Sequence, residues 1–572
     1  MLKKNRSTGS RGRGAARLIA ALVVLAGASG CLELDIPNLN DADAARAAGN
    51  AEDVQAFIGG AFYPTMWNAL HDDQQTTAAW PVAASESTAT MSGLTTQLFW
   101  EELREPRGLH DNGVILSIGN GPQGARDYWA WVNETASVAY DGLRFLDGGI
   151  EIEEDDVDVT PRARAFAKFM QGWAWGYGAM MFDQFHALPE DVELPADPLL
   201  VVDVAVEHLF DYDVVVELAI DALEEAISIA QANPTVVQYP AFPESQFWFG
   251  SPTPISNDKF IRMANTLAAR LLVLSSRNPQ DRADVPWDRV LAYTANGLND
   301  AVGDYEFQLQ GVRESQLMSR FINSATGTQN YRWDYRAIGP ADQSGAYQNW
   351  IGSPVAQRDR FNIETPDRRI TGLTPTSNGS YTVYHANDNG FTAERGTYLF
   401  SAYQWRRHHL ENGISNLNDD ADDIGEYGLI TVDENTLLRA EAFLRTNNAA
   451  AAVPLINVTR TRPRTILGTE HPGLPAVTVA GVPNPGGVCV PRLDNGDCGG
   501  LFAALRYEIV IENAVMDVAR GYAESRGWGT LPDGALLHWP VPGNALSLYG
   551  LSLYTYGGVG NPSTATYGPT PN

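Results

Sequence analysis

The stretch that decides the fold is residues 437–460, which read LLRAEAFLRTNNAAAAVPLINVTR. The pattern predicts one helix before the turn Thr446-Asn447-Asn448 and a second helix after it. The small residues Ala440 and Ala442 lie beside Phe443 and let two helices approach closely. Pro454 lies early in the second helix, where a proline is expected to shift the start or introduce a kink. The stretch therefore predicts a pair of packed helices.

Helical periodicity recurs along much of the chain. In 209–230, Val216, Ala219, Ile220, Leu223 and Ile227 form one apolar stripe. Helix pairs that bury their faces on neighbouring pairs are typical of repeat folds, and residues 437–460 are similar to a degenerate tetratricopeptide unit. We therefore expect a mainly α fold, a tetratricopeptide-like helical-repeat scaffold forming an α-α superhelix. The other expected helices are 53–70, 126–146, 160–180, 259–277, 287–298, 433–445, 449–460 and 501–520.

Residues 303–430 differ from the helical regions, because Gly, Asn, Thr and aromatic residues dominate there and helical periodicity is weak. The sequence predicts a helical scaffold from 51–300 and 431–526, interrupted by a large irregular insertion at 303–430. Residues 527–572, rich in Gly, Pro and Tyr, are expected to form a loop tail.

The composition is that of a folded, acidic protein. The 572 residues are 44% hydrophobic and 19% charged, and 40 Lys+Arg against 69 Asp+Glu give a formal net charge of -29. Nucleic-acid binding requires basic patches, so this charge argues against a nucleic-acid partner. It also disfavours docking on anionic lipid surfaces.

The first 30 residues have the pattern of an export signal. A basic stretch is followed by an apolar run, Leu18 to Ala28, and by Ala28-Ser29-Gly30-Cys31. The run is too short to span a membrane, which takes about 20 apolar residues. The end of the run resembles a bacterial lipobox, with Ala28 where leucine is usual, so we expect residues 1–30 to be removed and Cys31 to carry a lipid. The alternative is an ordinary secretory signal with a chance cysteine.

The other two cysteines, Cys489 and Cys498, are an even pair in an exported chain and predict a disulfide. The alternative is two free thiols. A zinc site would need four ligands, which this spacing does not supply.

Four stretches occur in order along the chain: the lipobox with 34–38, 164–183, 438–444 with 456–460, and 506–512 with 526–529 and 538–542. Together they resemble the SusD/RagB family of nutrient-binding outer-membrane lipoproteins. The resemblance covers nearly the whole mature chain. It implies a tetratricopeptide-like scaffold whose loops carry the ligand site. It also implies an anchored lid, on the outer face of the outer membrane, that passes glycans, peptides or other nutrients to a SusC-like TonB-dependent barrel.

The charged residues of these motifs are expected to be structural. A buried carboxylate is costly unless it is paired, and Arg460 on the neighbouring helix is positioned to pair with Glu441. Glu508, Glu512 and Arg526 are expected to tie the last scaffold helix to the tail loop.

Ligand contacts are expected from aromatic and amide side chains outside the scaffold helices, because flat rings stack on sugar faces while nearby polar groups bind hydroxyls. Most aromatic residues of a folded protein lie in its core, which is the alternative for each of them. The family's binding residues follow no transferable motif. The candidates are Trp80, Glu86, Trp100 and Arg104 in the first loop region, and Tyr331, Trp333, Tyr347 and Trp350 in the insertion.

No enzyme motif is present: His-Glu-x-x-His, Gly-x-Ser-x-Gly and Gly-x-x-x-x-Gly-Lys are all missing. A glycosidase carboxylate pair stays open, because Asp and Glu occur throughout the chain. The acidic runs 151–158 and 418–423 lack calcium-loop spacing, so we expect neither a metal nor a cofactor. Two hypotheses remain: a nutrient-binding lipoprotein without enzymatic activity, or a structural surface protein whose helical repeats bind another protein.

Overall fold

The computed structural model describes residues 50–60, 62–71, 87–89, 125–242, 248–309, 331–354, 357–386, 401–412, 425–517, 519–531 and 537–552. Trp80, Glu86, Trp100 and Arg104, the cysteine at position 31 and the signal segment 1–30 lie outside these residues.

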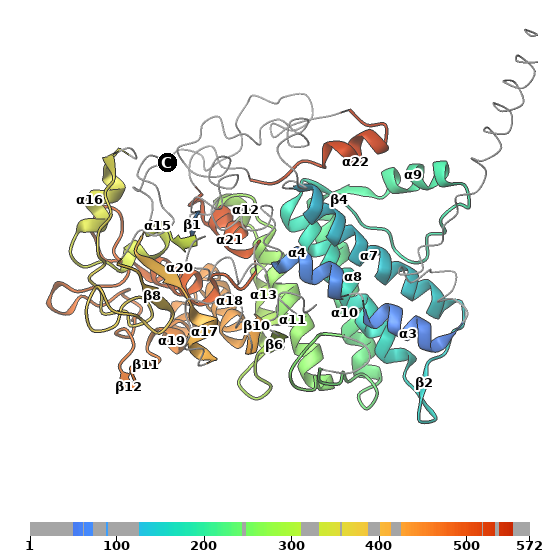
Figure 1. The fold of residues 1–572 in the computed structure, drawn as a ribbon, viewed down its shortest axis with the longest axis horizontal. Helices are drawn as coiled ribbons and strands as arrows, with labels where there is room; N and C mark the ends of the chain where they lie inside the picture. The colour runs from blue at the N-terminus through green and yellow to red at the C-terminus, as the bar shows by residue number, and fades with distance from the viewer. Residues whose placement is uncertain are drawn as a thin grey trace, which may run out of the picture.

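Helices make up the scaffold, which confirms the predicted mainly α class. Helix α8 lies at the centre of its first half, between α7 and α10 (Figure 1). All its residues from 165 to 181 are buried, as expected for a helix that is packed on every side. The helices of this half are α3 (Ala51–Gly59), α4 (Trp67–His71), α7 (Ala125–Asp147), α8 (Thr160–Met181), α9 (Pro198–Glu207), α10 (Tyr212–Ala232), α11 (Asn257–Leu274), α12 (Pro279–Ala283) and α13 (Trp287–Ala295).

Two glycines in α8 allow this close packing. A Cβ at Gly172 would lie 2.7 Å from the Ala219 carbonyl oxygen on α10, and a Cβ at Gly176 would lie 2.3 Å from a methyl group of Leu271 on α11. Both distances are far below van der Waals contact, so a larger residue would push the neighbouring helices away from α8.

Several boundaries differ from those predicted. Leu209–Asp211 is strand β5, paired with β4 (Gln184–His186), so the amphipathic helix starts at Tyr212. Asn278 caps α12 through its side chain, which makes Asn278-Pro279 a helix start as well as a break. The expected helix 53–70 is divided by a π-helical turn at Phe62–Met66. Helix α9 and the short tail helix α22 (Gly543–Leu548) were not predicted.

The second half of the scaffold contains the helix pair from which the fold was predicted. Helix α18 spans Val432–Arg445 and α19 spans Ala449–Arg460, so the second helix has the predicted bounds. Pro454 lies inside α19 without ending it. Asn448 accepts a hydrogen bond from the Ala451 amide and caps the second helix. The expected helix 501–520 ends early, as α20 (Leu501–Asn513), and a separate helix, α21, spans Arg520–Trp528.

The described part of the insertion forms short strands and helices; α15, α16 and β8 lie at the end of the molecule away from α7 and α10, whereas β6 and β10 lie beside α11 nearer its middle (Figure 1). Strand β6 leads into it and pairs with β10, which leads out of it, so this ladder joins the two ends of the insertion. The elements are β6 (Tyr305–Leu309), β7 (Tyr331–Trp333), α15 (Tyr335–Ile338), α16 (Ala346–Gly352), β8 (Thr382–Tyr384), β9 (Tyr403–Trp405), α17 (Arg407–Glu411) and β10 (Gly425–Ile430). Elsewhere the chain forms β1 (Ser87–Ala89), β2 (Glu153–Glu154), β3 (Val157–Asp158), β11 (Arg464–Ile466) and β12 (Thr469–His471).

The β6–β10 ladder holds carboxyl groups of like charge. Burial, together with the nearby carboxylates of Glu426 and Asp304, raises the pKa of Glu306 to about 7, against a smaller opposing effect of Lys259. The folded protein therefore binds a proton at Glu306 between the ordinary pKa of 4.5 and about 7, which the unfolded chain does not.

We expect this proton to make stability depend on pH. The contribution of protonated Glu306 is complete below the ordinary pKa of 4.5 and is lost as the pH rises to about 7. Glu306→Gln stays neutral, so its free energy of unfolding relative to wild type should increase between pH 5 and pH 8. Urea denaturation at both pH values measures this change. The exposed-site variant Glu151→Gln serves as the control, and an equal change in both variants contradicts the assignment.

Candidate functional site

The structure brings the two predicted ligand regions together through their backbones. Strand β1, which directly follows Glu86 in sequence, pairs antiparallel with β7, and the register places Ser87 opposite Trp333 and Ala89 opposite Tyr331. The first loop region and the insertion therefore meet at this ladder.

The rings of Trp333, Tyr347 and Trp350 are not available for stacking. Each of the three residues is 3% exposed and belongs to the main hydrophobic core. Tyr347 and Trp350 are three residues apart on α16, so the helix turns both rings to the same face, toward the core. The ligand-contact role predicted for these three residues is corrected to packing.

A pocket of about 410 Å³ opens between the insertion and the segment that follows α19. Its size lies in the range of small-molecule sites. Sequence reasoning missed it because the lining comes from three separate segments and carries no local motif. The lining residues are Asn378, Gly379, Ser380 and Tyr381 before β8, Leu410 and Glu411 at the end of α17, and 463–467 on and around β11.

The charged groups around the pocket are paired. The Tyr381 hydroxyl donates to Glu512 Oε2 at 2.7 Å and accepts from Arg464 Nη1 at 2.6 Å. Burial alone would raise the pKa of Glu512, but the guanidinium groups of Arg464, Arg407 and Arg369 outweigh burial and hold it well below its ordinary value. Arg407 Nε also donates to Glu411 at 2.9 Å. At neutral pH Glu512 is therefore ionised, and its ion pairs hold Tyr381 and Arg464 in place on the pocket lining.

Other groups in the pocket are suited to binding a solute. The Ser380 hydroxyl oxygen is buried and has no hydrogen-bond partner among the described residues. The Glu411 side chain is 50% exposed, and Leu410, Ile466 and Leu467 add apolar surface. Such a lining can bind a hydroxyl- or amide-bearing solute by hydrogen bonds and apolar contact.

A buried ion-pair network behind the pocket joins the insertion to α20. Arg369 donates to Asp367 at 2.8 Å, to Glu508 at 2.6 Å and to Glu512 at 2.8 Å. Arg369 is 2% exposed. Glu508 and Glu512 therefore tie α20 to the insertion, whereas the sequence had indicated the tail loop.

The predicted pair Glu441–Arg460 is not formed. Glu441 accepts hydrogen bonds at 2.9 and 2.7 Å from Arg282 of α12. Arg460 instead lies 3.4 Å from Glu508. The buried carboxylate is paired as expected, but its main partner is 159 residues away in sequence.

Arg526 holds the scaffold to the tail, in line with the prediction. Its guanidinium group donates to four backbone carbonyl groups on three segments, at 2.6–2.9 Å, and one of these is Leu537 in the tail.

Cys489 and Cys498 form the predicted disulfide. In the part of the chain that the structure describes, no three His, Cys, Asp or Glu side chains are grouped so as to hold a metal ion. No helix within those same residues is long and apolar enough to cross a membrane.

No protein-family model matches the chain, and no curated protein matches it. Among solved structures, a SusD superfamily protein from Bacteroides thetaiotaomicron is 13% identical, with 87% of this chain and 96% of that chain covered and a TM-score of 0.48. The chain is similar to SusD superfamily proteins. A second SusD superfamily protein, from Bacteroides vulgatus, is 11% identical over 84% of this chain and 89% of that chain, with a TM-score of 0.47. A structure with xylogluco-oligosaccharide is 11% identical over 87% of this chain and 85% of that chain, with a TM-score of 0.45.

Proposed function

We propose that this protein is a surface-exposed nutrient-binding lipoprotein. It captures a glycan, or another oligomeric nutrient such as a peptide, and delivers it to a SusC-like TonB-dependent outer-membrane transporter. The observation that carries the binding role is the pocket of about 410 Å³ between the insertion and β11. The export pattern and Cys31 support lipid anchoring in the outer membrane, facing the cell exterior, and the four family-like stretches support the transporter partner.

The lining favours binding without chemical change of the ligand. Catalysis by carboxyl groups needs an acid and a base with free access to the ligand. Here Glu512 is buried and paired with arginines, and one oxygen of Glu411 is bound by Arg407. The pocket therefore offers hydrogen-bonding groups, such as the Ser380 hydroxyl, without a free acid–base pair among the described lining residues.

The alternative function is a structural or protein-interaction surface lipoprotein without a nutrient ligand. It follows from the same helical scaffold, because helical-repeat folds present extended surfaces that bind other proteins. The two functions differ in whether a small solute raises the melting temperature.

We expect a bulky side chain in the pocket to block ligand binding. Thr465 is exposed and lines the pocket, so Thr465→Trp should fill it without disturbing the core. Affinity for the best ligand of a glycan and peptide panel, expected to be roughly micromolar to millimolar, should fall at least ~10-fold in calorimetric titrations. Thr469→Trp, an exposed site on the same hairpin outside the pocket, is the matched control and should keep wild-type affinity.

The outcomes separate the alternatives. If Thr465→Trp binds the ligand as wild type does, the pocket is not the site, and Trp80→Ala with Trp100→Ala then tests the first loop region. If no glycan or peptide binds or raises the melting temperature, the interaction protein is the better description. Turnover of a bound ligand contradicts a binding-only role.

A further inference from the structure

The disulfide closes a compact loop on the surface of the protein. Cys489 is 2% exposed, whereas residues 493–497 are exposed. The loop is folded by its own hydrogen bonds, because the Gly496 amide donates to the Leu493 carbonyl at 2.8 Å and the Leu493 amide donates to the Asp497 carbonyl at 2.9 Å. The turn needs a glycine, since Gly496 has φ +88°.

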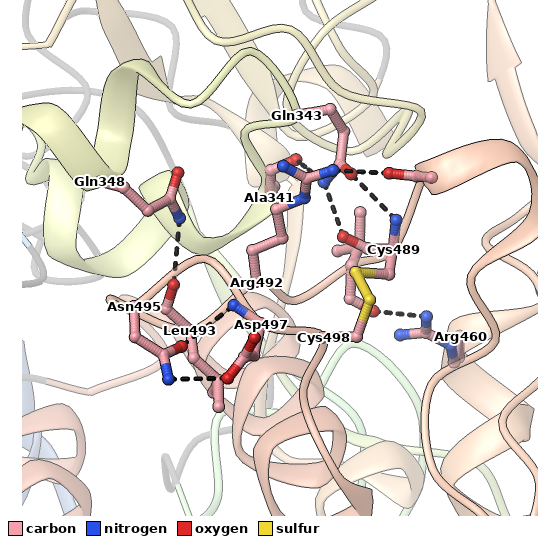
Figure 2. The surroundings of a disulfide bond; sticks show 12 residues. Ala341, Gln343, Gln348, Arg460, Cys489, Arg492, Leu493, Asn495, Asp497 and Cys498 are labelled. Atoms are coloured by element: carbon pink, nitrogen blue, oxygen red, sulfur yellow. Dashed lines mark hydrogen bonds between the residues drawn. A yellow bond between two sulfur atoms is a disulfide. The ribbon is translucent and has the colours of Figure 1, made fainter.

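One side of this loop is bound to the insertion. Gln343 binds Cys489 twice: its Nε2 donates to the Cys489 carbonyl at 2.7 Å, and its Oε1 accepts from the Cys489 amide at 2.9 Å (Figure 2). The Arg492 amide donates to the Pro340 carbonyl at 2.7 Å. Gln348 on α16 donates to the Leu493 carbonyl at 3.1 Å. The loop therefore binds both ends of residues 340–348, next to the buried ring of Tyr347.

The other side of the loop is bound to the scaffold. Arg460, at the end of α19 and 1% exposed, donates from Nη2 to the Val490 carbonyl at 2.5 Å. After Cys498 the chain reaches the start of α20 within three residues. The loop thus lies between the scaffold helices and the insertion and bonds to both.

We propose that residues 489–498 form a redox-dependent clip that holds residues 339–352 of the insertion on the helical scaffold. The proposal does not rest on the nutrient-binding function. A dithiol opens the clip: its thiolate attacks one cysteine sulfur, the Cys489–Cys498 bond breaks, and the second thiol of the reagent completes its own disulfide. Two electrons and two protons pass to the protein, which then carries two thiols.

Opening the clip should weaken the hold on the insertion. The closed ring limits the conformations of the loop in the absence of its contacts, so reduction raises the entropic cost of presenting the Cys489 and Leu493 backbone groups to Gln343 and Gln348. Residues 339–352 should then detach more often, while α8, which is buried at the centre of the first half of the scaffold, stays protected.

Hydrogen exchange with mass spectrometry on the full chain tests this. After treatment with dithiothreitol, with alkylation showing both thiols labelled, we expect amides of 335–352 to exchange ~10- to 100-fold faster. Amides of 160–181 should keep their rates. The variant Cys489→Ser with Cys498→Ser should show the same local change without a reductant.

A second variant links the effect to the hydrogen bonds. Gln343→Ala should speed exchange of 335–352 in the oxidised protein and add little in the reduced protein, because the contact is already weakened there. Gln357→Ala, an exposed site in the insertion, is the control and should change neither state. Unchanged exchange of 335–352 on reduction overturns the proposal. An equal increase in 160–181 also overturns it, because the disulfide would then stabilise the whole protein and not this segment.

Discussion

Arg369→Met is expected to lower the free energy of unfolding by about 3–5 kcal/mol, the cost of removing one partner from a buried ion pair. Arg369 is the shared partner of Asp367, Glu508 and Glu512, all of which are at most 1% exposed. Without its guanidinium group, negative charge is left in the interior with fewer donors. Denaturant unfolding followed by tryptophan fluorescence measures the loss.

A surface ion pair provides the control for this prediction. Arg289 pairs with Glu217 at 2.8 Å, but the side chains are 39% and 53% exposed. Arg289→Met should therefore cost less than about 1 kcal/mol. Arg369→Lys should recover only part of the loss, because an ammonium group cannot make the forked contacts of a guanidinium group. If Arg369→Met and Arg289→Met cost the same, the network does not stabilise the fold as argued.

Helix α19 was predictable because its signals are local. Asn448 caps it, the apolar spacing falls within it, and both are read from a few neighbouring residues. Some boundary errors arise because tertiary pairing overrides the local pattern. At Leu209–Asp211, pairing with β4 holds three residues in an extended strand, although their sequence continues the helical pattern.

The partners of buried charges were not predictable. The need for a partner at Glu441 follows from burial, but its identity depends on which helix the fold brings close. Arg460 lies on the next helix in sequence, whereas Arg282 is brought in by α12. The pocket was not predictable either, because Tyr381, Glu411 and Arg464 lie far apart in sequence and come together only in the folded chain.

The aromatic candidates of the insertion show a different limit. Aromatic and amide residues are interleaved between 330 and 350. Because this stretch shows no helical periodicity, its aromatic side chains are predicted to lie on an exposed loop. The structure forms the short helix α16 there, too short for a period to be recognised, and this helix turns Tyr347 and Trp350 inward. Composition indicated which residues occur in the insertion, but not which way they face.

The burial of Trp350 leads to a prediction opposite to that for a ligand-stacking ring. Its ring centroid lies 5.3 Å from that of Tyr335, and the Arg358 guanidinium carbon lies 4.4 Å from its ring centroid. Trp350→Ala should lower the free energy of unfolding by about 3–5 kcal/mol, as truncation of a buried tryptophan does. Denaturant unfolding, with ligand titration of the folded fraction, separates packing from binding.

Two control variants test how the loss of stability depends on the burial and the size of the aromatic side chain. Phe502 is an aromatic residue that is 41% exposed, so Phe502→Ala should cost clearly less than Trp350→Ala. Trp350→Phe keeps a ring in the cavity and should recover part of the stability. If Trp350→Ala leaves the unfolding midpoint unchanged and abolishes ligand binding, the ring faces the ligand in solution and the packing role is wrong. If stability falls while the folded fraction binds the ligand with wild-type affinity, the Trp350 ring packs in the core of the insertion and does not contact the ligand. The groups that bind the ligand then keep their positions when this packing is lost.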